Sequence, residues 1–326
     1  MKKILITIVL LLSIFTAMSQ RKPVIFDSDM GPDYDDVGAI TLLHNFAEEG
    51  KVHILATIAS TKYANVSAVL NVFNTYFNKP DIPVGVPKGN ALELRDWQHW
   101  TDSIVKNYPH RIKSNNEVPD AVALYRKILS AQPDKSVTIV TTGFLTNLKN
   151  LLQSEPDSLS SLTGMQLVTQ KVKMLVSMAG KFPQGSEFNI NRDFAASAYV
   201  YENWPTPVLF SGFEIGEKIK CGLPLIHNRS IQNDPVKDVF NISIPLAAED
   251  AAGRKSWDET AVLVAVMGYK KWFDVKKGKI VISDKDGSNT WMDDPDGRQA
   301  YLVEKASPAV LQKLIDNLIQ YQPVKK

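Results

Sequence analysis

The stretch VIFDSDMGPDYDDVGAI, residues 24–40, places five carboxylates between two apolar segments. The apolar run before it is typical of a buried strand, and the apolar residues after Asp36 are typical of a buried helix. Carboxylates so close in sequence repel one another, by roughly 1–4 kcal/mol per pair at about 4 Å. A helix start needs only one or two acids as caps. A bound divalent cation with oxygen ligands therefore explains the cluster better. Its members are Asp27, Asp29, Asp33, Asp35 and Asp36.

The rest of the chain alternates short apolar runs with segments of helical character. We expect strands at 24–26, 52–58, 82–86, 137–141, 172–178 and 207–210, and helices at 35–48, 66–77, 120–129, 145–152 and 195–202, with an irregular stretch at 87–117. This alternation predicts an α/β fold with a mostly parallel central sheet and helices on both faces. Ligands bind at the carboxyl ends of the strands in such sheets. The acidic cluster follows the first strand, where that rule places a site.

The two ends of the chain differ from this middle part. Lys2 and Lys3 precede an apolar run, residues 4–17, and Ala17 then begins the sequence Ala17-Met18-Ser19. This pattern predicts a signal peptide over residues 1–19, too short for a comfortable membrane span, with an uncleaved anchor as the alternative. The mature protein would then be exported, periplasmic or secreted, with no membrane contact. Residues 20–326 are expected to form one domain, in which 270–326 is the least familiar part and contains a strand at 278–283, a turn and a helix at 308–318.

Charge and cysteine content restrict the partners. The formal net charge is +2, and it falls to about 0 without Lys2 and Lys3. A chain without basic character offers no case for nucleic acid as a partner. Cys221 is the only cysteine, so an intrachain disulfide is excluded. We expect a small-molecule partner, and the sequence leaves a homo-oligomer open.

Further polar groups follow other expected strands. Thr142 begins a Thr-Gly-Phe-Leu-Thr-Asn motif after the strand at 137–141, and Glu187-Phe188-Asn189 follows the strand at 172–178. Asp258 precedes a late apolar run, residues 261–266. Any one of these could be a helix cap. Together they place polar side chains along one edge of the sheet.

In this order the motifs resemble the calcium-dependent nucleoside hydrolase family, of the inosine–uridine preferring kind. The resemblance extends to about residue 268. It rests on Asp27-Ser28-Asp29, Asp35-Asp36, Asn65-Val66-Ser67, Ile82-Pro83-Val84, Gly143-Phe144-Leu145-Thr146-Asn147, Met178-Ala179-Gly180, Glu187-Phe188-Asn189-Ile190 and Asp258.

The resemblance implies a reaction and a role for each residue. The reaction is hydrolysis of the N-glycosidic bond of ribonucleosides or related ribosides by a calcium-bound water. Asp29 would be the general base, which is sound chemistry for a metal-activated water. Oxygen-only ligands fit Ca²⁺ better than Zn²⁺. The implied metal ligands are Asp29, Asp36, Asp258 and the carbonyl of Thr142. The implied substrate contacts are Asp35, Asn65 and Asn189 on ribose hydroxyls, Glu187 on the 5′-hydroxyl side, and Met178 in the sugar pocket.

The chain departs from the family pattern in two places that matter. The spacing from Asp29 to Asp35 is two residues longer than in the best-known members, so Asp33 competes with Asp35 for the sugar-binding role. Trp257 stands where inosine–uridine preferring members have a His that is proposed to protonate the leaving base. An indole cannot supply that proton, although it can stack on a planar leaving group. His99 and His110 are the alternative acids.

Two other functions remain open. A phosphatase of the haloacid-dehalogenase type also places Asp-x-Asp after a first strand, but its downstream Lys and acidic pair are not evident here. A non-catalytic riboside-binding protein would keep the pocket and lack the acid at Trp257. The turn at Asp284-x-Asp286-Gly287 has the start of a calcium loop but no Glu at the required place, which favours a hairpin turn.

Overall fold

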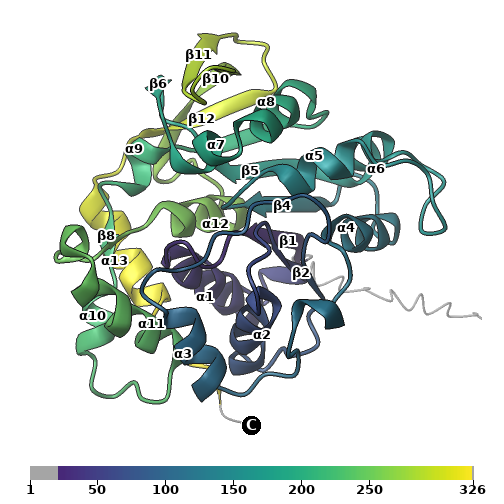
Figure 1. The fold of residues 1–326 in the computed structure, drawn as a ribbon. Helices are drawn as coiled ribbons and strands as arrows, with labels where there is room; N and C mark the ends of the chain where they lie inside the picture. Colours follow the sequence, from purple (N-terminus) through teal and green to yellow (C-terminus); the bar gives the residue numbers. More distant parts are fainter. Residues whose placement is uncertain (1–20, 325–326) are drawn as a thin grey trace, which may run out of the picture.

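The structure is a computed structural model that describes residues 21–324. Its centre is a ten-stranded sheet in the order β3-β2-β1-β4-β5-β7-β12-β10-β11-β6 (Figure 1). From β3 to β12 all neighbouring strands are parallel, and β12-β10-β11-β6 are antiparallel. The expected mostly parallel α/β sheet is therefore confirmed. The sheet strands are β1 (Lys22–Ser28), β2 (Val52–Ala59), β3 (Val84–Gly85), β4 (Val137–Thr141), β5 (Val172–Met178), β6 (Gln184–Gly185), β7 (Val208–Ser211), β10 (Phe273–Ile282), β11 (Asn289–Asp293) and β12 (Gln299–Glu304).

Helices cover both faces of this sheet, and β8 (Lys220–Cys221) pairs with β9 (Arg254–Lys255) outside it. The helices are α1 (Asp35–Glu48), α2 (Val66–Tyr76), α3 (Trp100–Asn107), α4 (Ala121–Ser130), α5 (Thr146–Leu152), α6 (Gly164–Lys171), α7 (Phe188–Arg192), α8 (Phe194–Asn203), α9 (Phe213–Gly216), α10 (Leu223–His227), α11 (Pro235–Ser243), α12 (Trp257–Met267) and α13 (Pro308–Leu318).

The first strand shows how the two faces are filled. Val24 and Phe26 belong to a buried cluster with α1, α2 and α12, whereas Ile25 belongs to a second cluster with α4, α5 and α8. Alternate side chains of a strand point to opposite faces, so a strand covered on both sides must be apolar throughout. The central helix α12 packs along α1, and Gly38 permits this because a side-chain carbon there would collide with the Glu259 carboxylate.

Several elements differ from the sequence-based expectations. The strand expected at 82–86 is only Val84–Gly85, at the edge of the sheet, because Pro83 has no N–H to donate. The stretch at 87–117 contains α3, which buries Trp100. Helix α6 was not expected, although Thr163 and Gln166 form the capping box that begins it.

The C-terminal segment extends the main sheet. Strand β12 pairs with β7 in parallel, β10 and β11 form an antiparallel hairpin, and the turn between them contains Asp286, whose carboxylate accepts from Ser288. The expected hairpin turn and the helix at 308–318 are both present.

The predicted signal peptide lies outside the described residues, so export stays a prediction. Within residues 21–324 we find no helix with both the length and the apolar character needed to cross a bilayer.

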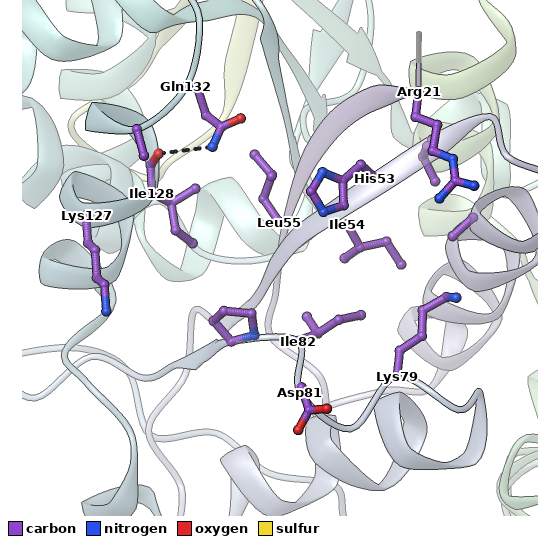
Figure 2. Close-up of a pocket in the computed structure, with 14 residues that line it drawn as sticks. Arg21, His53, Ile54, Leu55, Lys79, Asp81, Ile82, Lys127, Ile128 and Gln132 are labelled. Atoms are coloured by element: carbon purple, nitrogen blue, oxygen red, sulfur yellow. Dashed lines mark hydrogen bonds between the residues drawn. The ribbon is translucent and has the colours of Figure 1, made fainter. Parts of the chain in front are cut away.

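A large cavity lies at the amino ends of the strands, away from the acidic cluster. It measures about 510 Å³, and Figure 2 shows its apolar floor and mostly cationic border. Asp81 is the only acid among its lining residues, so it offers none of the chemistry expected of the site. Its labelled members are Arg21, His53, Ile54, Leu55, Lys79, Asp81, Ile82, Lys127, Ile128 and Gln132.

Candidate active site

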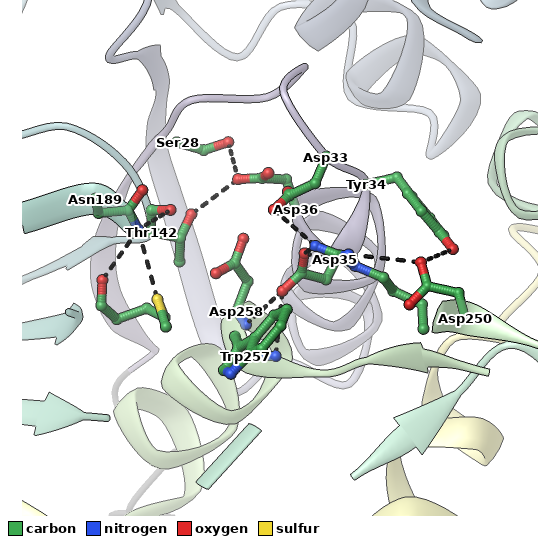
Figure 3. Close-up of polar contacts among 12 residues, drawn as sticks. Ser28, Asp33, Tyr34, Asp35, Asp36, Thr142, Asn189, Asp250, Trp257 and Asp258 are labelled. Atoms are coloured by element: carbon green, nitrogen blue, oxygen red, sulfur yellow. Dashed lines mark hydrogen bonds and ion pairs between the residues drawn. The ribbon is translucent and has the colours of Figure 1, made fainter. Parts of the chain in front are cut away.

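A small pocket lies at the carboxyl ends of β1, β4 and β5 and at the start of α12. Parallel strands end at one edge, which brings together residues that are far apart in the chain (Figure 3). The pocket contains most of the residues expected from the sequence, and Asp36 is buried close to them. Its lining residues are Asp29, Asp33, Asp35, Thr142, Met178, Glu187, Phe188, Asn189, Phe213, Trp257 and Asp258.

Asp36 is fully buried and held by two hydroxyl groups. One of its oxygens accepts from the Ser28 hydroxyl at 2.6 Å and from the Thr142 hydroxyl at 3.1 Å. The other oxygen, Oδ2, is buried and has no partner among the described residues. Burial, and then the charge of Asp35, raise the pKa of Asp36 to about 6.

Asp29 and Asp258 are buried beside Asp36, and each is less than 5% exposed. Burial is the main cause that raises the pKa of both carboxyls well above the usual range. The next cause is Asp36 for Asp29, and Asp35 for Asp258. The fold thus holds like-charged carboxylates together in a buried site, which destabilises their ionised forms. A cation bound between them would offset this free-energy cost.

The donor set has the chemistry of a hard-cation site. In residues 21–324 no three Asp, Glu, His or Cys side chains stand in a ready metal-binding arrangement. However, Asp36 Oδ2 lacks a partner, the surrounding donors are oxygens, and the carbonyl of Thr142 accepts only a 3.2 Å bond from Asn189. These groups would have to draw closer around an ion, and they fit Ca²⁺ or Mg²⁺ better than a metal that prefers nitrogen or sulfur.

Added Ca²⁺ is expected to stabilise the protein more at pH 7.5 than at pH 5. The pKa of Asp36 rises from 3.8 to about 6 on folding, so the folded state keeps a proton that the unfolded state loses. The free energy of unfolding of the metal-free protein therefore falls as the pH rises through this range. Above this pH range the carboxylate ligands are ionised, so they bind the cation with their full affinity. At about 100 times Kd the ion should raise Tm by about 5 °C.

Differential scanning fluorimetry with and without Ca²⁺ at the two pH values measures this effect, and Asp36→Asn serves as the matched variant. The variant should lose most of the response to Ca²⁺ at pH 7.5. An equal response of the variant and the wild type would show that Asp36 is not a ligand.

Both carboxylate oxygens of Asp35 already have hydrogen-bond partners within the protein. Its Oδ1 accepts from Arg254 at 2.6 and 3.1 Å, and its Oδ2 accepts the backbone N–H groups of Trp257 and Asp258, both at 3.2 Å. Asp35 thus caps the start of α12, as an acid at a helix N-terminus does. By fixing this turn it fixes the direction of Asp258.

Arg254 was not singled out in the sequence, and it is buried at the centre of this network. Its guanidinium also pairs with Asp33 at 2.6 Å, and it lies between the rings of Tyr34 and Trp257, at 4.9 and 5.1 Å from their centroids. The Asp33 side chain remains 38% exposed, whereas that of Asp35 is 2% exposed. Of the two acids that compete for the sugar-binding role, Asp33 is the one that a ligand can reach.

On the opposite wall, Glu187 and Asn189 are tied to the ends of strands. The Glu187 carboxylate accepts from the N–H groups of Asn189 at 2.7 Å and of Gly180 at 3.1 Å. The Asn189 side chain donates to the carbonyls of Thr142 at 3.2 Å and Met178 at 3.3 Å. These hydrogen bonds orient both side chains, which line the pocket.

The family model described as inosine-uridine preferring nucleoside hydrolase matches residues 24–306 of the chain. The chain belongs to this nucleoside hydrolase family. It is 27% identical over 237 residues to the pyrimidine-specific ribonucleoside hydrolase RihA of Shewanella sp. (strain ANA-3), an alignment that covers 69% of this chain and 66% of that protein. It is 23% identical over 233 residues to the inosine-uridine preferring nucleoside hydrolase of Crithidia fasciculata, covering 68% of this chain and 70% of that protein.

Solved structures of other nucleoside hydrolases have the same fold as this chain. The purine-preferring ribonucleoside hydrolase from Gardnerella vaginalis superposes with a TM-score of 0.70 at 17% identity, covering 92% of this chain and 99% of that one. A plant nucleoside hydrolase gives 0.68 at 17% identity with the same coverage. At this identity the likeness concerns the fold. The chain spans about two thirds of the length of the Shewanella relative.

Besides the buried Asp36, three residues expected from the sequence to serve this nucleoside hydrolase site lie outside the pocket lining. Asn65 precedes α2 with a left-handed φ of 71° and is exposed. The His99 side chain is 70% exposed next to Asp102, and His110 contacts the Tyr108 carbonyl. Trp257 does line the pocket, and its indole N–H donates to the Phe213 carbonyl at 2.8 Å. The group at the expected acid position therefore presents a ring to the pocket.

Proposed function

We propose that the protein hydrolyses the N-glycosidic bond of ribosides in this pocket, with Ca²⁺ as its cofactor. The observation that carries the proposal is the convergence of the buried carboxyls of Asp29, Asp36 and Asp258 at the carboxyl edge of the sheet, in a pocket that Phe213 and Trp257 also line. Loss of an N-linked leaving group passes through an oxocarbenium-like state with positive charge on the sugar. Fixed carboxylates around that charge stabilise it more than they stabilise the neutral ground state.

Asp29 is the proposed general base. It lines the pocket, and burial with its acidic neighbours raises its pKa, which makes it a stronger proton acceptor once ionised. Asp36, Asp258 and the Thr142 carbonyl, together with Asp29, would hold the ion. When bound, Ca²⁺ would lower the pKa of a water molecule and orient it toward the sugar. Asp29 would then take the proton of that water as it attacks.

Asp33 is proposed to bind the ribose hydroxyls in place of Asp35. Arg254 holds the Asp33 carboxylate at 2.6 Å while leaving it exposed at the pocket. Asn189 and Glu187 would complete the sugar site from the opposite wall, with Met178 between them. Asn65, which is exposed and does not line the pocket, could contact a ligand only after a local rearrangement.

The leaving group is expected to depart without a proton from the protein. Trp257 offers a ring for stacking, and its N–H is already used by Phe213. Substrates that need no protonation, such as p-nitrophenyl riboside, should therefore have kcat/KM values at least about 100-fold above those of inosine or uridine, the order of a general-acid contribution.

Incubation of the purified protein with these three compounds in Ca²⁺, with release of reducing sugar as the readout, tests both the function and this preference. Ribose release from p-nitrophenyl riboside supports the proposal, and comparable kcat/KM values on all three would mean that another group supplies the proton. Binding of ribosides without any release would favour a non-catalytic riboside-binding protein. Phosphate release from p-nitrophenyl phosphate would favour a phosphatase instead, although the described residues that line the pocket include no Lys.

We also propose export, on the basis of the leader sequence alone. Fractionation of cells that express the full chain, with sizing of the N-terminus by mass spectrometry, tests it. A protein that retains residues 1–19 in the soluble cytoplasmic fraction would overturn the proposal. We propose a small-molecule partner with no role for nucleic acid or membranes, and size-exclusion chromatography tests for a homo-oligomer.

A further inference from the structure

Three aromatic side chains line the active-site pocket, and we refer to Phe188, Phe213 and Trp257 together as the aromatic wall. Phe213 and Trp257 are in contact, with ring centroids 5.1 Å apart. Phe188 is 40% exposed, so the wall reaches from the pocket to the solvent. Such a surface suits a planar leaving group.

Each ring of the aromatic wall carries a cation of its own. Lys181 Nζ lies 4.8 Å from the centroid of Phe213, and Lys255 Nζ lies 5.5 Å from that of Trp257. The Arg192 guanidinium lies 5.2 Å from the centroid of Phe188. These residues come from three separate segments of the chain, which makes their common placement around one pocket the informative feature.

These three cations differ from Arg254 in their charge balance. Arg254 is neutralised by Asp33 and Asp35, whereas the ion pairs found in residues 21–324 include none to Lys181, Arg192 or Lys255. Glu214 is an acid whose charge acts on Lys181, but it is largely buried and accepts from the Phe182 N–H at 2.9 Å. The border of the pocket is therefore positive, while its floor is acidic.

This polarity selects a substrate with the opposite charges at its two ends. The floor favours the sugar, which becomes positive as the bond breaks, and it disfavours a phosphate on the 5′ side, to which the family resemblance assigns Glu187. The border favours negative charge on the leaving group. We infer that the site, given the proposed function, prefers ribosides whose planar leaving group carries an anionic substituent.

Pyridinium ribosides fit this preference and also need no acid. Water attacks the anomeric carbon, the bond from that carbon to the ring nitrogen breaks, and its electron pair stays on the nitrogen, which becomes neutral. The proton of the water goes to Asp29 and then to solvent. Nicotinic acid riboside carries a carboxylate on the leaving ring, and nicotinamide riboside is its uncharged-substituent counterpart.

The test compares kcat/KM for these two ribosides in Ca²⁺ at low ionic strength. Nicotinic acid riboside should be preferred by about tenfold. Its carboxylate would lie near several partly solvated cations, and this attraction gains of order 1 kcal/mol. The pyridine of nicotinate is the more basic and hence the poorer leaving group, so a preference for it arises from the enzyme. The preference should fall as salt is raised from about 0.02 to 0.5 M.

Charge-removal variants locate the effect. Lys181→Gln, Arg192→Gln and Lys255→Gln should each reduce the acid-to-amide ratio by about two- to threefold. Lys127→Gln is the matched control, since this lysine is exposed at the opposite edge of the sheet (Figure 2), and its ratio should equal that of the wild type. An equal kcat/KM for both ribosides in the wild type, or a ratio that the three variants leave unchanged, would overturn the inference.

Two further measurements separate this inference from the proposed function. Nicotinamide mononucleotide, which carries its phosphate on the sugar, should be a poorer substrate than nicotinamide riboside, and the reverse order would show that the cations bind a 5′-phosphate. If neither riboside is hydrolysed, the proposed function fails. In that case the inference is tested by the Kd values of the two ribosides, measured by quenching of tryptophan fluorescence. The inference requires nicotinic acid riboside to bind more tightly than nicotinamide riboside.

Discussion

Asp29→Ala is expected to lower kcat by about 10³-fold or more, because it removes both the proposed proton acceptor and one of the metal ligands. Asp29 is 4% exposed and faces the pocket at the end of β1, where a substrate sugar and a bound ion would meet. Asp36 and Asp35 are poorly placed to replace it, since Asp36 already accepts from Ser28 and Thr142, and Asp35 is bound to Arg254.

The same substitution should leave the fold intact. Burial and like charges raise the pKa of Asp29 well above the usual range, so the ionised side chain destabilises the metal-free folded state at neutral pH. Removing it relieves that repulsion and offsets the small loss of packing. Circular dichroism and Tm in EDTA measure this, with kcat on p-nitrophenyl riboside measured in Ca²⁺. A loss of activity below tenfold with an intact fold would exclude Asp29 as the base.

Much of the fold follows from local sequence patterns. Helix α1 begins at Asp35 and ends at Glu48 as expected, and β4 and β5 also have the expected bounds. These elements are long or uniformly apolar, and their hydrophobic patterns decide between strand and helix. The edge strand β3 and the short helices α7, α9 and α10 have too few residues to establish a period, so tertiary contacts determine them.

The site could be predicted as a set of residues but only partly as a set of roles. A strand that ends in Asp-x-Asp at the carboxyl edge of a parallel sheet marks the location. The sequence could not decide between Asp33 and Asp35, because the choice depends on Arg254, a residue more than 200 positions away whose side chain reaches both acids. One signal was available: Arg254 lies four residues before Asp258, in a short strand that leads into the same helix.

Asp35→Ala is expected to destabilise the protein by about 3 kcal/mol, the lower end of the cost of breaking a buried ion pair, because Arg254 loses one of its acidic partners but keeps others. The Arg254 guanidinium would keep Asp33 at 2.6 Å and the more distant Asp250 at 3.6 Å. The first N–H groups of α12, those of Trp257 and Asp258, would lose their acceptor. Because this turn orients Asp258 toward the metal site, kcat should also fall, by about 100-fold.

Asp33→Ala is the matched comparison, since Arg254 binds both acids but the Asp33 side chain is 38% exposed and that of Asp35 only 2%. It should change the free energy of unfolding by less than about 1 kcal/mol, as for a partly exposed ion pair. It should raise KM for ribosides at least tenfold, because it removes a contact to the sugar hydroxyls. Urea unfolding gives the free energy of unfolding of each variant, and steady-state kinetics give the KM of each. If Asp35→Ala raises KM without loss of stability while Asp33→Ala is silent, the roles are reversed, and Asp35 must leave Arg254 to bind the sugar.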